Sequence, residues 1–431
     1  MKPWFMLTPS LTSTRTIAHK QARVDVRSRL PLTRDFGLIW LSQLVAQVGD
    51  GVSKLALLWF VYSITGSPLK TTAIGLLQTI PPIVCGPLIG VFVDRLPKKI
   101  LLIGSNVVRA ILIGFIPCAI PVDTFTVNLL YILVLLDALA MAAVSPTLTA
   151  LVPMVVPRAQ FTSANALIQS TTSLGIIFGP ALSGLGIALF GPQEVLCLNA
   201  VTYLASALCL AFVRARLQSQ TERQGTGDRS LFRDLREGLA FVTVKERVIL
   251  LLIVAAGLYG FGASALTTLF PVFTKKMLDL GPVEVGYLWS AMGVGLLVMS
   301  IVLLWFTERT LSDRIKIIAW TSAVSGLAIG FLVLTTDLFL VGLIMVVIGA
   351  GIGAFTPIAW SVVQELTPGT LLGRVMSLYS TGAMTAAISG ISMFGWVTER
   401  FGESTGVAGI GVTFLLTAFL GGWLSWSIRT R

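Results

Sequence analysis

Long apolar runs, separated by short polar segments, dominate this chain. Each run holds about 20 residues, the length that a helix needs to cross the hydrocarbon core of a bilayer. Twelve runs are predicted to be membrane-spanning helices, at residues 37–62, 71–93, 99–119, 126–146, 164–190, 195–213, 248–273, 284–306, 315–335, 338–361, 372–397 and 406–428. The pattern therefore predicts an all-α integral membrane protein.

The composition excludes a soluble globular protein. Hydrophobic residues make up 55% of the 431 residues and charged residues 12%, whereas soluble domains average about 45–50% and about 25%. The four cysteines lie within or at the edges of the apolar runs and lack metal-like spacing. We interpret them as packing residues and expect neither disulfides nor a metal site: Cys85, Cys118, Cys197 and Cys209.

The basic residues indicate how the spans are oriented, because cytoplasmic loops retain Lys and Arg. With the N-terminus inside, 25 of the 31 Lys and Arg residues fall on the cytoplasmic side, four outside, and two, Lys54 and Arg109, deep within spans. We therefore expect a multi-pass protein of the cell membrane with both termini in the cytoplasm. The net charge of +11 then reflects topology and attraction to lipid headgroups, and it requires no nucleic-acid partner.

The chain divides near its middle. Residues 1–34 form a polar, basic tail, for which a disordered cytoplasmic segment is favoured over an organellar transit peptide. Six spans follow in residues 35–213 and six more in residues 248–428. The polar linker between them, residues 214–247, contains a predicted amphipathic helix at Ser230–Val242.

The two sets of spans carry matching features. Pro146 and Pro157 recur 211 residues later as Pro357 and Pro368, and an acidic-basic pair after span two has a partner after span eight. Such a repeat indicates two parallel six-helix halves, related by an axis along the membrane normal, with a substrate site between them near the midplane.

Two motifs then suggest a family. Residues 90–102 read GVFVDRLPKKILL, which resembles the loop 2–3 signature of the major facilitator superfamily, with Phe92 and Pro97 where Leu and Gly are usual. Residues 175–184 read GIIFGPALSG, similar to the signature of that superfamily's antiporters, with Ser183 in place of a Gly. Shorter matches at residues 49–50, 65–67 and 373–376 make the chain resemble the branch of siderophore exporters and macrolide efflux proteins.

The resemblance implies a twelve-helix major facilitator fold and a monomeric secondary active transporter without a cofactor. It also implies proton-coupled efflux, by alternating access, of a small amphiphilic organic molecule that is drug-like, macrolide-like or siderophore-like. Proton-coupled import of a small metabolite uses the same fold and stays an alternative, as does a non-transporting scaffold or receptor.

The motif residues also have physical interpretations. In the loop, a carboxylate can accept hydrogen bonds from a neighbouring helix end while basic side chains meet headgroups or carboxylates. We favour a gate over a plain positive-inside loop for Gly90, Asp94, Arg95, Lys98 and Lys99. In span five, small residues on one face permit close helix contact, which is either a leak-resistant seam or ordinary packing: Gly175, Gly179, Pro180 and Gly184.

Span one carries a polar stripe. Gln43, Gln47, Asp50 and Lys54 are spaced by four, three and four residues, which places them on one helix face. A charged residue at the bilayer centre costs about 2.5–3.5 kcal/mol on insertion scales, so this face is expected to meet protein or water. Arg109 in span three and Asp137 in span four lie at similar depth, and the four charges can pair.

Our hypothesis is that Asp50 is the proton-responsive carboxylate, supported by Asp137, while Gln43, Gln47, Lys54 and Arg109 contact the substrate. The alternative is a static ion pair between Asp50 and Lys54, one turn apart.

The second half presents no charge deep in spans seven and eleven. It offers Tyr259 and Tyr379 as an aromatic wall for an amphiphilic substrate, although packing is the commoner role of such residues. An enzyme is not expected, because the single histidine, His19, lies in the tail and no Walker-type glycine loop is present.

Overall fold

The computed structural model describes residues 33–118, 124–157, 160–214, 239–240, 242–243, 247–303, 310–368 and 371–429. Within these residues the long regular elements are all helices. The first half comprises α2 (Arg34–Thr65), α3 (Pro68–Arg95), α4 (Lys98–Phe115), the short η1 (Ile116–Cys118), α5 (Thr124–Ala142), α6 (Val144–Val155), α7 (Phe161–Phe190) and α8 (Pro192–Ala211). The second half comprises α10 (Arg247–Met277), α11 (Pro282–Leu303), α12 (Leu311–Phe331), α13 (Leu338–Leu366), α14 (Leu372–Phe401) and α15 (Glu403–Arg429).

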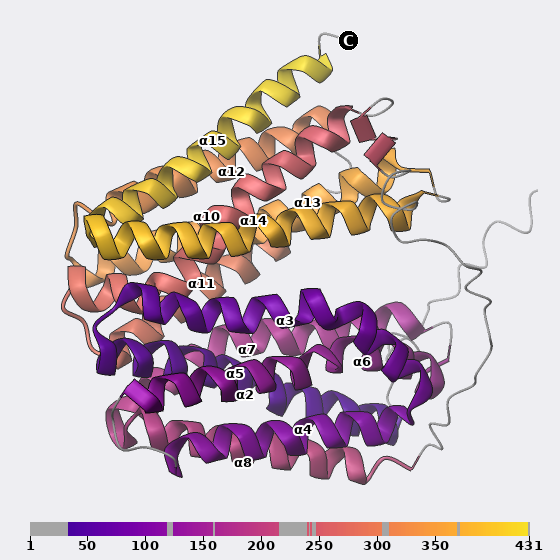
Figure 1. Ribbon diagram of the computed structural model, residues 1–431. Coiled ribbons are helices and arrows are strands. Elements are labelled where there is room, and N and C mark those ends of the chain that lie inside the picture. The colour runs from indigo at the N-terminus through magenta and orange to yellow at the C-terminus, as the bar shows by residue number, and fades with distance from the viewer. Residues whose placement is uncertain are drawn as a thin grey trace, which may run out of the picture.

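The two halves repeat one packing scheme. In the first half α2 packs against α7 and α8, α4 against α8, and α3 against α5. In the second half α10 packs against α14 and α15, α12 against α15, and α11 against α13, which are the equivalent pairs. Figure 1 shows the halves as two layers of roughly parallel helices. The predicted fold of twelve spanning helices in two six-helix halves is therefore confirmed, with α5 and α6 together forming span four.

The halves meet along two helix pairs, α7 with α11 and α3 with α14. Both pairs join an element of the first half to one far away in the sequence. In several short turns between successive spans a glycine occupies the left-handed region, as at Gly66 (φ 63°) after α2 and Gly402 (φ 89°) between α14 and α15, whereas Asp279 (φ 51°) does so between α10 and α11. These turns let each helix run back antiparallel to its predecessor.

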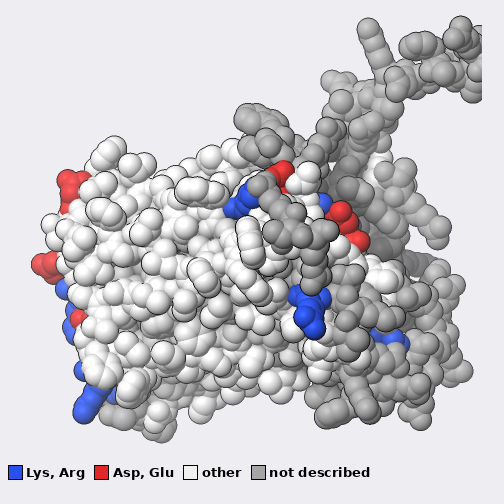
Figure 2. Space-filling model, turned by 90° about the horizontal axis from the view of Figure 1, so that it is seen from above, with Lys and Arg blue, Asp and Glu red and all other residues white. Residues whose placement is uncertain are grey.

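Nine helices among the described residues are long and apolar enough to cross a membrane by composition alone. Three others, α3, α4 and α14, lie in the same bundles (Figure 1). For α4 the reason is plain, because its 18 residues include Lys98, Lys99 and Arg109. Figure 2 shows the matching surface, on which the visible Lys, Arg, Asp and Glu gather near the two ends of the helices and a broad belt between them carries none.

Two predicted segments cannot be compared with the structure. The tail, residues 1–34, lies outside the described residues apart from its last two. The linker helix at Ser230–Val242 is also almost wholly outside them. Both therefore stay predictions.

Candidate functional site

A polar seam joins α2 to α8 in the first half. Ser42 and Ser206 share a hydrogen bond of 2.7 Å between their hydroxyls. Asn199 donates from its side-chain amide to the hydroxyl of Ser53, which lies on α2 11 residues after Ser42. Asn106 on α4 donates to Ser206 Oγ at 3.0 Å, which ties the third helix to the seam. These bonds fix α2, the helix with the predicted polar stripe, against its neighbours.

The charges of this half form one cluster around Arg109. The Nη2 atom of Arg109 lies 2.7 Å from Oδ1 of Asp50, and its Nε lies 3.0 Å from Oδ1 of Asp137. Tyr203 on α8 accepts a hydrogen bond from Arg109 Nη2 at 2.7 Å and donates its own hydroxyl hydrogen to Asp50 Oδ1 at 2.5 Å. One guanidinium therefore joins carboxylates from α2 and α5 to a tyrosine from α8. A planar group with five donors suits such a junction.

Sequence reasoning missed Tyr203. A signal for it exists, since Asn199, Tyr203 and Ser206 are spaced by four and three residues, the same spacing that revealed the stripe in span one. The three side chains make the contacts of the polar seam and of the Arg109 cluster, so span six carries a second stripe that faces the first.

The alternative of a static pair between Asp50 and Lys54 is wrong in this structure. Asp50 pairs with Arg109, and the Lys54 ammonium makes no hydrogen bond or ion pair with the described residues. Instead, Lys54 Nζ lies 5.7 Å from the centre of the Trp289 ring on α11, in the other half. The Lys54 side chain is therefore directed toward the opposite half of the molecule and not toward Asp50.

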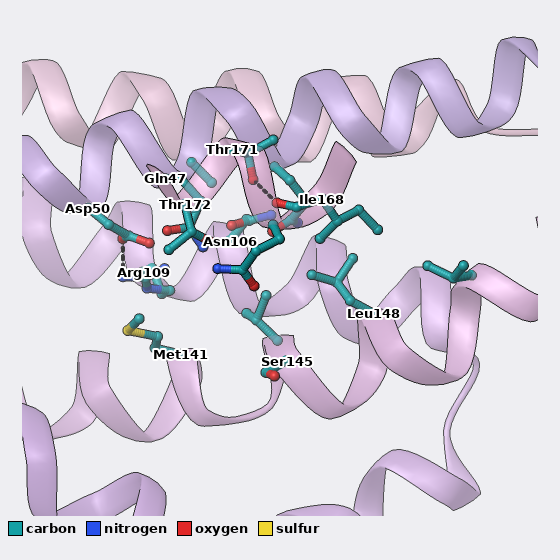
Figure 3. Close-up of a pocket in the computed structure, with 15 residues that line it drawn as sticks. Gln47, Asp50, Asn106, Arg109, Met141, Ser145, Leu148, Ile168, Thr171 and Thr172 are labelled. Atoms are coloured by element: carbon teal, nitrogen blue, oxygen red, sulfur yellow. Dashed lines mark hydrogen bonds and ion pairs between the residues drawn. The ribbon is translucent and has the colours of Figure 1, made fainter. Parts of the chain in front are cut away.

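Three cavities meet at these charged residues. The first, of about 290 Å³, lies within the first half and includes Gln43, Gln47, Asp50 and Arg109 in its lining (Figure 3). The second, of about 170 Å³, lies between the halves and has a mostly apolar lining, and Lys54 also lines it. The apolar residues include Ile176, Trp289, Met292, Leu296 and Ile352.

The third cavity borders the other two. It measures about 290 Å³ and shares Asp50 and Arg109 with the first cavity and Lys54 and Thr267 with the second. Asp137 and Tyr203 also line it, together with residues of α10 and α14 from the second half. We call the first cavity the polar chamber, the third the junction and the second the apolar chamber. The junction shares lining residues with both chambers.

The predicted aromatic wall of the second half lies elsewhere. Tyr259 is 7% exposed, and its ring stacks on Phe355 at 4.1 Å between centroids and meets the edge of Phe414. Tyr379 is 5% exposed. Neither tyrosine lines the three central cavities. In this conformation both belong to the core of the second half, because apolar neighbours bury their rings, and their prediction as substrate contacts gains no support.

Of the predicted gating loop, the structure describes the side chains of Lys98 and Lys99 and leaves those of Gly90, Asp94 and Arg95 outside the described set. Lys98 is 5% exposed. Lys99 donates from Nζ to the backbone carbonyls of Ala211 at 2.8 Å and Val213 at 2.7 Å. A cation at the carbonyl end of a helix is stabilising, so Lys99 caps α8 and ties it to the start of α4.

The small residues of span five contact two different helices. Gly175 and Gly179 on α7 face α2, where a Cβ atom on Gly175 would meet the carbonyl oxygen of Gln47. Gly184, nine residues after Gly175, faces α11 of the other half, close to Gly286 and the carbonyl of Pro282. The proline of the motif, Pro180, lies inside α7. The motif therefore packs α7 both within its own half and across the interface.

The interface is closed at the end opposite to the chain termini. Glu399 on α14 accepts hydrogen bonds from Ser67 Oγ at 2.8 Å and from the backbone N–H of Leu69 at 3.2 Å, at the start of α3. Lys275 on α10 donates to Ser63 Oγ at 3.3 Å, and its ammonium lies 4.9 Å from the centre of the Trp59 ring. We call these contacts the outer latch, because this end is the outer one in the topology predicted from the Lys and Arg residues.

Comparisons with known proteins agree with this architecture. The chain is 24% identical over 369 residues to macrolide efflux protein A of Streptococcus pyogenes, covering 85% of this chain and 90% of the relative. It is 27% identical over 393 residues to the multidrug efflux pump Tap of Mycolicibacterium fortuitum, covering 88% and 91%.

Solved structures show the same fold. A bacterial homologue of the iron transporter ferroportin, in an inward-facing state, superposes with a TM-score of 0.72 at 16% identity, covering 93% of this chain and 100% of that one. The peptide transporter POT gives a TM-score of 0.72 at 14% identity, covering 91% and 94%. The sequence model of the Major Facilitator Superfamily matches residues 39–391. The chain therefore belongs to the Major Facilitator Superfamily of membrane transporters.

Proposed function

We propose that this transporter exports a small amphiphilic organic molecule in exchange for protons, with both termini in the cytoplasm. The observation that carries the proposal is the position of Asp50. It lines both the polar chamber and the junction between the halves, and it is held by Arg109 at 2.7 Å and Tyr203 at 2.5 Å. The names of two relatives, a macrolide efflux protein and a multidrug efflux pump, support export.

The charge balance of the cluster suits proton coupling. Two carboxylates, Asp50 and Asp137, share the single guanidinium of Arg109, so the cluster carries one excess negative charge when both are ionised. A proton removes that excess. The Asp50 side chain is 16% exposed and borders two cavities, so a proton can reach it. We assign the proton to Asp50 and a supporting role to Asp137, whose carboxylate keeps Arg109 in place.

Coupling requires that the proton and the substrate compete. A protonated Asp50 no longer holds Arg109 and Tyr203 as a charged partner, and this loosens α2 from α4 and α8. A substrate that occupies the chambers contacts the same junction at Asp50, Arg109 and Lys54. We propose an amphiphilic substrate because the three cavities differ in lining: the first is a polar chamber, the next a charged junction and the last an apolar chamber.

The two halves then rock about this junction. The outer latch is closed in the structure, and it must open for release outside. At the other end, the loop between α3 and α4 is proposed as the inner gate, with Lys99 anchoring α4 to the end of α8. Opening of one gate and closing of the other gives alternating access.

Transport into inverted membrane vesicles tests the proposal. The probe is radiolabelled erythromycin, and the vesicle interior is made more acidic than the medium. Vesicles with the unchanged protein are expected to accumulate the label. Asp50→Asn is expected to lose gradient-driven uptake while retaining binding. Glu403→Gln is the matched control, because Glu403 pairs with Lys276 at the outer end and lines none of the three chambers. Gradient-driven uptake by Asp50→Asn at the level of the control would contradict the proposal. Loss of label from preloaded inverted vesicles under the same gradient would indicate import instead.

A further inference from the structure

The polar chamber has an unusual lining. Four side-chain carboxamides from three helices face it: Gln43 and Gln47 from α2, Asn106 from α4 and Gln169 from α7. Figure 3 shows Gln47, Asn106 and Thr172 directed toward one another in its centre, with Asp50 and Arg109 at one end and Leu148 and Ile168 toward the other.

One of these carboxamides is buried without a partner. Gln43 is 2% exposed, and its Nε2 atom makes no hydrogen bond within the described part of the chain. A buried donor without an acceptor is costly, and native structures rarely keep one without a reason. Gln47 and Gln169 likewise make no side-chain hydrogen bond to the described residues. The chamber therefore holds several donors and acceptors that are available to a guest.

The lining also restricts the chemistry of that guest. Among the described lining residues the charged ones are Asp50 and Arg109, and Arg109 also pairs with Asp137, so the cluster keeps one excess negative charge and disfavours an anionic guest. The described residues of the lining include no Phe, Tyr or Trp, so they provide no stacking surface for a flat aromatic base. An apolar guest would leave the carboxamides unsatisfied.

A hydroxylated ring meets these conditions. Each hydroxyl both donates and accepts a hydrogen bond, as each carboxamide does, and such groups can surround a sugar from several directions. The aliphatic side chains of Leu148 and Ile168 can cover its C–H face. A volume of about 290 Å³ suits one such ring rather than a whole drug-sized molecule.

We propose that this chamber binds a sugar or polyol group of the transported molecule. The inference rests on the proposed function and sharpens it, since the substrate becomes a neutral hydroxylated head joined to an apolar body. The body extends past Asp50 toward the apolar chamber at Trp289. A ligand placed in this way touches the proton-binding carboxylate from the polar side.

Equilibrium binding to the full-length protein in lipid nanodiscs tests the inference without a pH gradient, so its outcome is independent of the vesicle assay. The probes are 4-methylumbelliferyl β-glucoside, its glucuronide, and 7-methoxy-4-methylcoumarin, which share one coumarin body. The glucoside is expected to bind about tenfold more tightly than the methoxycoumarin, as one or two additional hydrogen bonds would give. The charged glucuronide is expected to bind more weakly than the glucoside.

Gln43→Leu is expected to abolish the preference for the glucoside and to leave methoxycoumarin binding unchanged. Gln364→Leu is the matched control, since Gln364 is a carboxamide on α13 that lines none of the three cavities. Equal binding of glucoside and methoxycoumarin to the unchanged protein would overturn the inference whatever the variants do. Retention of the full preference by Gln43→Leu would also overturn it.

Discussion

The hydroxyl of Tyr203 donates to Oδ1 of Asp50 across 2.5 Å, and this bond joins α8 to α2 at the centre of the first half. The same oxygen of Asp50 accepts from Arg109, whose guanidinium carbon lies 4.3 Å from the centre of the Tyr203 ring. Tyr203 thus contacts Asp50, to which we assign the proton, through its hydroxyl, and Arg109, the partner of Asp50, through its ring.

Tyr203→Phe separates these two contacts. The ring keeps its place beside Arg109, and the hydrogen bonds to Asp50 and Arg109 are lost. Hydrogen bonds to charged groups contribute about 1.5–3 kcal/mol, so we expect a loss of stability in that range and a slower gradient-driven uptake. Thermal unfolding in detergent and the vesicle assay measure the two effects. A stability equal to that of the unchanged protein would show that the hydroxyl does not hold α8 to α2.

Replacing Arg109 should destabilise the protein more than replacing either of its carboxylate partners, Asp50 or Asp137. Arg109→Gln leaves Asp50 and Asp137 without their cation in a buried site, and breaking a buried pair in this way costs about 3–5 kcal/mol. The double variant Arg109→Gln with Asp137→Asn removes one of the stranded charges, so it is expected to be more stable than Arg109→Gln alone. Unfolding of the single and double variants gives the coupling energy, and strict additivity would contradict a shared cluster.

Much of this arrangement could be predicted from the sequence, and the limits have physical causes. The stripe in span one and the depth of Arg109 and Asp137 follow from helical periodicity and the cost of charge in lipid. The partner of Asp50 does not, because Lys54 is equally available by spacing along α2. Only the packing of α4 against α5 and α8, together with that of α8 against α2, places a guanidinium within reach of two carboxylates.

The tyrosines illustrate the same limit. Tyr203, Tyr259 and Tyr379 all lie within apolar runs, so the residue type and its run alone do not distinguish a tyrosine that binds a carboxylate from one that packs. Asn199 and Ser206 lie on the same helix face as Tyr203, and these polar neighbours indicate that Tyr203 makes polar contacts. Tyr259 instead packs on Phe355, which lies 96 residues further along the chain and cannot be paired with it by periodicity.

The outer latch predicts a defined effect on access from outside. Glu399→Ala removes two hydrogen bonds that hold α14 to the start of α3. At about 0.5–1 kcal/mol for each of these solvent-exposed bonds, the outward-open population should rise about fivefold or more. In a chain without its native cysteines, Thr72→Cys reports this opening, because Thr72 is fully buried against Gly395 in the closed state.

Labelling of that cysteine by a membrane-impermeant maleimide on intact cells is the measurement. Glu399→Ala should accelerate it, and Glu403→Ala should not, because Glu403 pairs with Lys276 inside the second half at the same end of the molecule. Equal rates in the two variants would show that Glu399 does not hold the halves together.

Two glycine-to-alanine substitutions, Gly184→Ala on α7 and Gly104→Ala on α4, are expected to have opposite effects on stability. Gly184→Ala places a methyl group against the carbonyl of Pro282 and 3.1 Å from Cα of Gly286. Both residues lie on α11, which packs against α7 across the interface between the halves. Overpacking of this kind costs about 1–3 kcal/mol, so thermal stability should fall. Gly104→Ala on α4 meets nothing within 4 Å and should gain about 0.5–1 kcal/mol from helix propensity. Because the two variants change the same atoms, a lower unfolding temperature for Gly184→Ala alone isolates the contact between α7 and α11. If the two variants unfolded at the same temperature, the close approach of these helices would not limit the stability of the protein.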